Sequence, residues 1–598
     1  MDNREVHGAL AEIAVLLGLS PEGRFKAEAY QRGAQIVATL PELAALVEAE
    51  RLTEIDGIGA SLSAQISELV RTGRSALLER LRSQYPKGAA ELSGLPGMTL
   101  RRIKAVSEGL GVSSLDELHE ACREQRVRAL PGFGAKTEQR LLDALREREQ
   151  VATGPVRMRI AEAQLLAAEL CAQLVRLQVA DSVEPVGALR RGEEIIDELE
   201  LLAFGERGRV LEALPSLPSL VLAEGEGRAR LSSGLPLVVH VAPASAAGEH
   251  LLLTTGPEVH VEAMRARASE RGRELGELGP GAGGEWAAAA GSGAAEGAAA
   301  AGPGAGAEHA AAVGQLGPGA GGERPAVAHE RALYVRLGLP YVPPEARHLP
   351  IDAAGYDDLV EVGDVRGMVH CHTTYSDGKA SIEEMARAAE ALGMQYITIT
   401  DHSPSAHYAR GVELDRLKQQ WDEIAAVQER VSIRILRGTE SDILGDGNLD
   451  YPDAVLEQLD VVIASIHSRL RMNRDEMTTR LVRAMEQPVF KIWGHALGRL
   501  LLKRDPIDCD VERVLDALAS SRGAVEVNGD PYRLDLPPMW LPAAKARGLR
   551  FVLSVDAHST KGMRALSYAV TMARRGGLRR ADVLNTLPTP DFLAQVKV

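Results

Sequence analysis

The sequence predicts a multidomain α/β protein whose chain ends in a barrel of parallel strands and helices. From residue 366 onward, short apolar runs alternate with segments of helical length, such as Ser381–Leu392 and Val511–Ser520. Apolar strands that alternate with helices are typical of a parallel sheet covered by helices. Earlier in the chain, Gly-rich turns precede helical patterns, and residues 274–328 are dominated by Gly, Ala and Pro. At 598 residues, the chain is long enough for several domains with separate cores.

Composition and charge narrow the class of protein. No run of apolar residues is long enough for a membrane span, and the chain starts without the apolar run of a signal peptide. The cysteines are too few and too scattered for a disulfide framework: Cys122, Cys171, Cys371 and Cys509. We therefore expect a cytoplasmic protein without a membrane partner. The net charge of −15 argues against nucleic-acid binding by bulk electrostatics, but not against local contacts with a phosphate backbone.

Three Gly-rich turns occupy the first 150 residues, each at the start of a helical pattern. Backbone N–H groups at such a helix start face outward and can hold a phosphate. The candidate DNA-binding residues are Gly57, Gly59, Gly97, Gly132, Gly134 and Lys136. One such turn is more often a plain turn, whereas three close together favour DNA binding. The middle turn has Thr99 in place of its second glycine, which leaves a purely structural role open there.

These turns resemble helix-hairpin-helix elements, which hold DNA backbones without reading the base sequence. Residues 1–90 also resemble the amino-terminal domain of family X DNA polymerases, and residues 91–150 a second helical helix-hairpin-helix region. Some family members use a lysine in the first domain as a Schiff-base nucleophile. The matching position here is Gln65, whose amide cannot form that adduct, so we expect no lyase activity.

Residues 151–245 resemble the nucleotidyltransferase-like α+β palm of the same polymerases. Gly187-Ala-Leu-Arg190-Arg191-Gly192 is followed by Glu198-Leu-Glu200, where the family has Asp-x-Asp, and Val238 stands at the third catalytic aspartate. Two-metal catalysis needs carboxylates that hold both ions about 3.5–4 Å apart. The extra methylene of glutamate shifts a carboxylate by about 1 Å, a displacement that can cost roughly 100-fold in rate. We therefore predict a degenerate palm, retained to hold DNA, without a working pair of magnesium ions.

Residues 246–345 resemble the thumb of these polymerases, interrupted by an insert at 274–328. The insert repeats one motif, at Leu278–Glu285 and at Leu316–Glu323. It has too little bulky apolar surface to offset the entropy of ordering, so we predict a flexible tether and assign it no function. Residues 346–365 are the predicted linker into the barrel.

The barrel region, 366–598, places imidazoles and carboxylates just after its apolar runs. The candidate ligands are His370, His372, Asp377, His402, Glu440, His467, His495, Asp556 and His558. A single histidine is more often merely hydrogen-bonded, but so many at strand ends predict a site on the carboxyl-terminal face of the barrel. Such ligands suit zinc, manganese and iron alike. Their number predicts two or three divalent ions.

This ligand set resembles that of the PHP (polymerase and histidinol phosphatase) domain, a distorted (β/α)7 barrel. The resemblance implies a first metal held by His370, His372, Glu440 and Asp556. It implies a second held by Glu440, His467 and His495, and a third held by Asp377, His402 and His558. The implied catalytic residues are Glu440, Asp377, Asp556, His402 and Arg499. Cys371 lies between the first two histidines, and a strand would point it away from them.

Together these resemblances imply a bacterial DNA-repair enzyme, associated with the nucleoid. The barrel would act as a metal-dependent 3′–5′ exonuclease or phosphoesterase on gapped, nicked or 3′-end-containing DNA. Three alternatives stay open: retained gap-filling synthesis at the palm, a non-catalytic DNA-binding scaffold, and a small-molecule phosphatase acting on a compound such as histidinol phosphate. Protein partners do not follow from the sequence.

Overall fold

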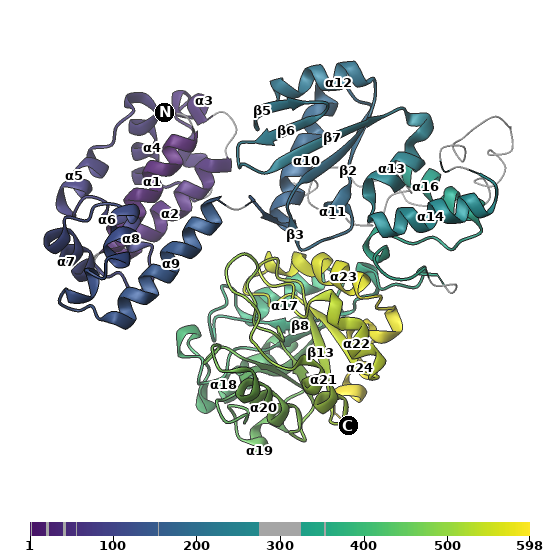
Figure 1. The fold of residues 1–598 in the computed structure, drawn as a ribbon. Helices are drawn as coiled ribbons and strands as arrows, with labels where there is room; N and C mark the ends of the chain where they lie inside the picture. Colours follow the sequence, from purple (N-terminus) through teal and green to yellow (C-terminus); the bar gives the residue numbers. More distant parts are fainter. Residues whose placement is uncertain are drawn as a thin grey trace. The chain divides into compact units, whose positions relative to one another are not determined.

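The computed structural model describes the chain except residues 2, 20–22, 40–42, 56, 154, 274, 276–324, 352–354 and 598. It divides into two compact units, Met1–Pro155 and Val156–Val598, which are described separately (Figure 1). Most of the predicted insert lies outside the described residues. Among the described residues, no helix is long and apolar enough to cross a membrane.

The first unit is built from helices around one apolar core. Its helices are α1 (Asn3–Gly18), α2 (Arg24–Thr39), α3 (Leu43–Glu48), α4 (Ala60–Thr72), α5 (Ala76–Gln84), α6 (Ala89–Ser93), α7 (Leu100–Leu110), α8 (Leu115–Arg123) and α9 (Ala135–Thr153). Buried side chains recur at helical spacing, as at Val6, Leu10 and Ile13 of α1, because one face of each helix packs inward. Since α9 runs to Thr153, the boundary predicted after residue 150 falls inside this helix.

The second unit begins with a small α+β region, as predicted for the palm. Its elements are β1 (Met158–Arg159), α10 (Ile160–Arg176), β2 (Ser182–Pro185), α11 (Gly187–Arg190), β3 (Ile195–Ile196), β4 (Leu199–Phe204), α12 (Arg207–Ala213), β5 (Leu220–Gly225), β6 (Arg228–Leu231) and β7 (Pro236–Ala242). Five strands form a sheet in the order β2-β4-β7-β6-β5, in which β4 and β7 are parallel neighbours. Then come α13 (Ala247–Thr255), α14 (Glu258–Glu270) and α16 (Pro325–Leu337).

A parallel seven-stranded sheet follows, in the order β14-β13-β12-β11-β10-β9-β8. Its strands are β8 (Gly367–Cys371), β9 (Tyr396–Ile399), β10 (Arg434–Asp442), β11 (Val461–Ser465), β12 (Lys491–Trp493), β13 (Gly523–Asn528) and β14 (Arg550–Ser554). The two edge strands meet through a parallel bridge between Cys371 and Ala557, so the sheet curls into a nearly closed barrel. The predicted barrel is thereby confirmed, and β13 is a strand that the sequence analysis did not identify.

Helices surround these strands (Figure 1). They are α17 (Ile382–Ala391), α18 (Leu414–Gln428), α19 (Asp453–Leu456), α20 (Arg474–Met485), α21 (Val511–Ala519), α22 (Leu541–Ala546), α23 (Leu566–Arg575) and α24 (Thr589–Lys597). The start of α17 shows how local sequence fixes an element. Ser381 Oγ accepts from the Glu384 backbone N–H at 3.3 Å, while the Glu384 carboxylate accepts from the Ser381 N–H at 2.7 Å. This reciprocal cap satisfies two backbone donors that the helix cannot pair.

Candidate functional site

The barrel gathers the predicted ligands at the carboxyl ends of its strands. β8 carries His370 and leads to His372, β10 carries Glu440, and β14 leads to Asp556. Three groups of these side chains have ligand atoms within 4.8 Å of one another. They are His370, His372, Glu440 and Asp556; His402, Glu440 and His467; and His372, Asp377, His402 and His558. The remaining predicted ligand, His495, lies with its Nε2 atom 2.7 Å from Glu440 Oε1.

Glu440 stands at the centre of this arrangement, and its side chain is fully buried. Its two carboxylate oxygens lie within 3.5 Å of nitrogens from five histidines: His370, His372, His402, His467 and His495. Oε1 faces His467 and His495, whereas Oε2 faces the other three. A carboxylate with different neighbours at its two oxygens has the geometry to bridge two ions.

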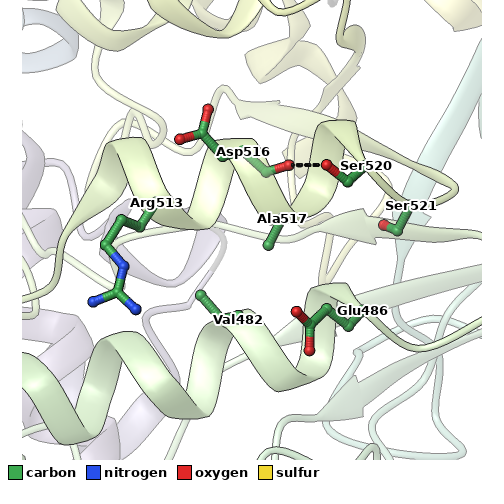
Figure 2. A pocket seen from close by; sticks show the side chains of 7 residues that line it. All are labelled: Val482, Glu486, Arg513, Asp516, Ala517, Ser520 and Ser521. Carbon is green, nitrogen blue, oxygen red and sulfur yellow. Dashed lines mark hydrogen bonds between the residues drawn. The ribbon is translucent and has the colours of Figure 1, made fainter.

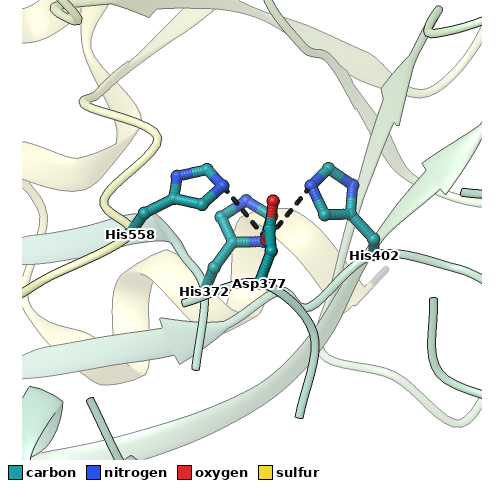
Figure 3. A group of neighbouring side chains, drawn as sticks. All are labelled: His372, Asp377, His402 and His558. Atoms are coloured by element: carbon teal, nitrogen blue, oxygen red, sulfur yellow. Dashed lines mark ion pairs between the residues drawn. The ribbon is translucent and has the colours of Figure 1, made fainter. Parts of the chain in front are cut away.

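Asp377 organises the group at the rim of the cluster (Figure 3). Its Oδ1 atom lies 3.2 Å from His558 Nε2 and 3.6 Å from His402 Nε2. The first ligand group matches the one implied by the resemblance, residue for residue. The other two differ in detail, because His372 joins the group of Asp377 and His402 belongs to two groups.

The side chains fit divalent ions because several of their buried polar atoms have no hydrogen-bond partner. Within the described part of the chain, several ligand atoms lack a hydrogen-bond partner: His370 Nε2, His372 Nδ1 and Nε2, His402 Nδ1, Glu440 Oε2, His495 Nδ1 and Asp556 Oδ1. Leaving a buried polar atom unsatisfied costs about 1–3 kcal/mol. So many such atoms pointing into one space are consistent with metal ligation. Cys371 is buried in the apolar core beside the cluster and is absent from the three ligand groups.

Carboxylates shift the proton affinity of the histidines. Burial alone would lower the pKa of His467, but Glu440 and Asp442 raise it to about 10. Burial likewise opposes protonation of His558, and Asp377 raises the pKa of that imidazole to about 9. Burial would raise the pKa of Glu440, yet the surrounding imidazoles hold it well below its usual value. A metal must therefore displace protons to reach these nitrogens.

We expect manganese binding at pH 8 to release at least about two protons per chain. A raised imidazole pKa means that the proton is held up to that pH, so metal affinity falls as the pH falls below it. Calorimetric titration with manganese in two buffers of different ionisation enthalpy gives the number of protons released. Binding without proton release at pH 8 would contradict the protonated state of His467 and His558.

Carboxylates behind the ligands hold the imidazoles in place, and the sequence analysis did not identify them. His370 Nδ1 lies 2.6 Å from Glu526 Oε1, to which Ser554 Oγ also donates at 2.5 Å. His467 Nδ1 bonds to the Asp442 carboxylate in the same way. Such outer partners fix the orientation of the ring and raise its basicity as a ligand. The only signal for Glu526 in the sequence was an acidic residue inside an otherwise apolar run, Gly523–Asn528.

Replacing Glu526 by glutamine is expected to weaken manganese affinity or activity by roughly 10- to 100-fold. The amide keeps the volume of the carboxylate but removes the charge that orients His370. Manganese dependence of phosphodiester cleavage measures the effect. The matched control is Glu457→Gln, because Glu457 is exposed beside α19. Equal manganese dependence in the two variants would show that Glu526 does not tune the site.

The structure does not bring Arg499 into the cluster. Its guanidinium pairs with the Glu194 carboxylate of the predicted palm, and its Nε donates to the Arg533 carbonyl oxygen at 2.9 Å. A catalytic role for Arg499 therefore stays a prediction. Arg533, which the sequence analysis did not single out, places its Nε 3.5 Å from Asp556 Oδ2 and brings a partly buried cation to the ligands.

Comparison with known proteins agrees with this geometry. Family models match four segments: a PHP domain at 369–529, a helix-hairpin-helix domain at 1–75, a SAM-like helix-hairpin-helix tandem at 89–147 and a DNA polymerase beta thumb at 250–348. A Bacillus subtilis protein, DNA polymerase/3′-5′ exonuclease PolX, is 32% identical over 608 residues that cover 100% of each chain. The chain belongs to the PolX family.

Other relatives match the barrel alone. A probable phosphatase of Thermoanaerobacter sp. is 30% identical over 36% of this chain and 89% of its own length. A probable phosphatase of Caldanaerobacter subterraneus is 28% identical over 36% of this chain and 85% of its own length. The similarity to the Bacillus subtilis PolX also covers the regions ahead of the barrel.

The two glutamates of the predicted palm motif, Glu198 and Glu200, are paired with basic side chains. Glu200 and Val238 are directly opposite each other on β4 and β7. The Glu200 carboxylate lies 3.1 Å from His240 Nε2, and Glu198 lies 3.5 Å from Arg228, whose partner across β6 and β7 is Val238. Of the two palm arginines, Arg190 pairs with Glu330 at 2.7 Å and Arg191 with Glu193 at 2.5 Å.

The three predicted turns each lead into a helix of the first unit. Gly59 precedes α4, Thr99 precedes α7 and Gly134 precedes α9. A glycine before each helix start has positive φ: +91° at Gly57, +77° at Gly97 and +85° at Gly132. Arg102 links the second and third turns by donating to the carbonyl oxygens of Gly97 at 2.7 Å and Gly132 at 3.2 Å. Lys136 lies in the first turn of α9.

Gly134→Val is expected to weaken binding to gapped duplex DNA by about 5- to 10-fold, because a side chain would hold a phosphate away from the amides of α9. A Cβ atom at Gly134 meets nothing within 4 Å and its φ is not positive, so the fold should tolerate the change. Affinity is measured without divalent ions to prevent cleavage. Gly8→Val on exposed α1 is the control, and equal affinity of the two variants would make the turn purely structural.

A surface pocket lies between α20 and α21 (Figure 2). Its lining residues are Val482, Glu486, Arg513, Asp516, Ala517, Ser520 and Ser521. Ser520 and Ser521 lead into β13, so the pocket borders the amino end of that strand. The cluster lies at the carboxyl ends, and we assign the pocket no role.

Proposed function

We propose that the chain is a metal-dependent 3′–5′ exonuclease or phosphoesterase acting on DNA ends during repair, and that its palm no longer synthesises DNA. One observation carries the nuclease proposal: a buried glutamate, Glu440, with five histidines within 3.5 Å of its two oxygens. Divalent ions held by these side chains would supply an activated water molecule and would neutralise the phosphate under attack. Manganese, zinc and iron all suit this ligand set.

The protein's own side chains prepare the site for a phosphodiester. Glu526 and Asp442 orient His370 and His467, so the ligands are held before metal arrives. Arg533 offers a guanidinium to a phosphate oxygen beside Asp556. The first ligand group, His370, His372, Glu440 and Asp556, is almost completely withdrawn from solvent, which strengthens the charge interactions among its members.

DNA is the favoured substrate because the regions ahead of the barrel match helix-hairpin-helix and polymerase thumb models. We propose that they hold gapped, nicked or 3′-ended duplexes. A small-molecule phosphatase leaves those regions unexplained, since the phosphatase relatives cover 36% of the chain. A non-catalytic scaffold leaves the ligand set unexplained. Retained gap filling is the second candidate, favoured by the name of the Bacillus subtilis relative, DNA polymerase/3′-5′ exonuclease PolX.

One experiment separates these functions. A gapped duplex with a labelled 3′-ended strand is incubated with the full chain and manganese, with and without deoxynucleotides, and the products are sized. We expect the strand to shorten under both conditions. Lengthening with nucleotides would support the gap-filling alternative. An unchanged strand would contradict the nuclease and favour the scaffold or the phosphatase.

A further inference from the structure

Two aromatic rings stand out among the large apolar side chains exposed in the described part of the chain. They are Tyr408, which is 67% exposed, and Tyr532, which is 49% exposed. Both border the metal cluster. Tyr408 contacts two predicted ligands, and Tyr532 adjoins Arg533, which pairs with the ligand Asp556. Aromatic rings are large apolar groups that proteins usually bury, so exposed rings beside a charged site point to a ligand.

Tyr408 is held against the ligands while most of its surface faces solvent. Its ring centroid lies 5.9 Å from those of both His402 and His467, at interplanar angles of 63° and 60°. The turn that carries it, His407–Ala409, is anchored by the buried Ala406 and Ala409 on either side. The turn therefore holds the ring beside these two imidazoles, which limits the conformational freedom lost on binding.

The ring of Tyr532, although half exposed, already contacts two cations. The Arg159 guanidinium lies 4.2 Å from the centroid of the Tyr532 ring, and Lys503 Nζ lies 5.6 Å from it. A cation over an aromatic face is a favourable contact that a base would have to displace. Tyr375, another aromatic near the rim, is also engaged: its hydroxyl donates to Glu423 at 2.7 Å and Arg416 lies over its ring. Tyr408 is the better candidate for stacking.

Resting on the nuclease function proposed above, we propose that Tyr408 is the stacking platform for a nucleobase at the metal centre. The nucleotide whose phosphate lies at the group of His402, Glu440 and His467 places its base on the exposed face of Tyr408. Stacking on an aromatic face tolerates every base, because each base has a π-face. Tyr408 thereby selects nucleic acid over phosphodiesters that carry no base.

The test compares substrates with and without a base. The full chain with manganese is assayed on an oligonucleotide with an ordinary 3′-terminal nucleotide, on the same oligonucleotide with an abasic terminal residue, and on the same oligonucleotide ending in a three-carbon spacer phosphodiester, which has no ring. Tyr408→Ala should raise KM for the ordinary oligonucleotide by about 5- to 150-fold. Its kcat/KM on the other two substrates should change less than about twofold, and Tyr408→Phe should behave as wild type because stacking needs the ring alone.

Two further variants keep the test decisive. Tyr408→Leu retains apolar contact with the imidazoles but lacks a planar face, so it should lose the ordinary substrate alone. Leu392→Ala is the control, since Leu392 is 41% exposed just before β9, at the amino end of the barrel. Equal losses on all three substrates would overturn the proposal and make Tyr408 a support for the ligands. Failure of wild-type protein on every substrate would instead refute the nuclease function.

Discussion

Replacing Glu440 by glutamine should abolish phosphodiester cleavage, with a loss of roughly 1,000-fold or more. The carboxylate faces five histidines through its two oxygens, so the amide would disturb more than one metal position at once. An amide is a weaker, neutral ligand, and the lost metal stabilisation of several kcal/mol corresponds to such a factor. The measurement is shortening of a labelled 3′-ended strand in manganese.

Two controls accompany this variant. Glu457→Gln removes an exposed carboxylate from the same barrel and should retain full activity. Affinity for gapped duplex should be unchanged in Glu440→Gln, because the helix-hairpin-helix turns lie in the other unit. Full exonuclease activity in purified Glu440→Gln protein would refute the assignment of the nuclease to the barrel.

The barrel was predictable because its strands carry a strong local signal. Val461–Ser465 and Tyr396–Ile399 are buried at every position, as strands covered on both faces must be, and a ligand follows each. The carboxyl ends of parallel strands lie at one end of the sheet, so the residues that follow the strands lie close together. The ligands could therefore be assigned to one site from the sequence alone. The sequence could not predict as well which ligands would share an ion, because His372 and His402 each belong to two groups.

The elements that escaped prediction depend on partners far away in the chain. Glu526 interrupts the apolar pattern of β13, and its burial makes sense only beside His370 and Ser554. Arg499 pairs with Glu194, which lies 305 residues earlier in the chain. The position of Arg533 at Asp556 likewise depends on how two loops meet. The hydrophobic pattern of a single segment cannot predict these side-chain contacts, because tertiary packing decides which distant residues meet.

The palm is expected to be inactive as a polymerase, and one reversion should not restore it. Each glutamate has one methylene more than aspartate, so we expect Glu198 and Glu200 to misplace their carboxylates for two ions, and Val238, opposite Glu200, supplies no oxygen. The double variant Glu198→Asp, Glu200→Asp would restore the side-chain length of aspartate, but the third carboxylate would still be missing. The triple variant, which adds Val238→Asp, restores all three carboxylates. The new aspartate would lie beside Arg228, the residue opposite position 238 on the neighbouring strand β6.

The polymerase activity of the palm is measured by primer extension with magnesium and deoxynucleotides. Every protein also carries Glu440→Gln to remove the nuclease activity. We expect no extension from the unaltered palm or from single reversions, and extension at least roughly 100-fold faster from the triple variant, the scale that a misplaced group costs. Val221→Asp is the control, because it adds an exposed carboxylate to β5, at the edge of the same sheet. Robust template-directed extension by the unaltered palm would show that its two glutamates suffice. The protein would then fill gaps as well as trim ends.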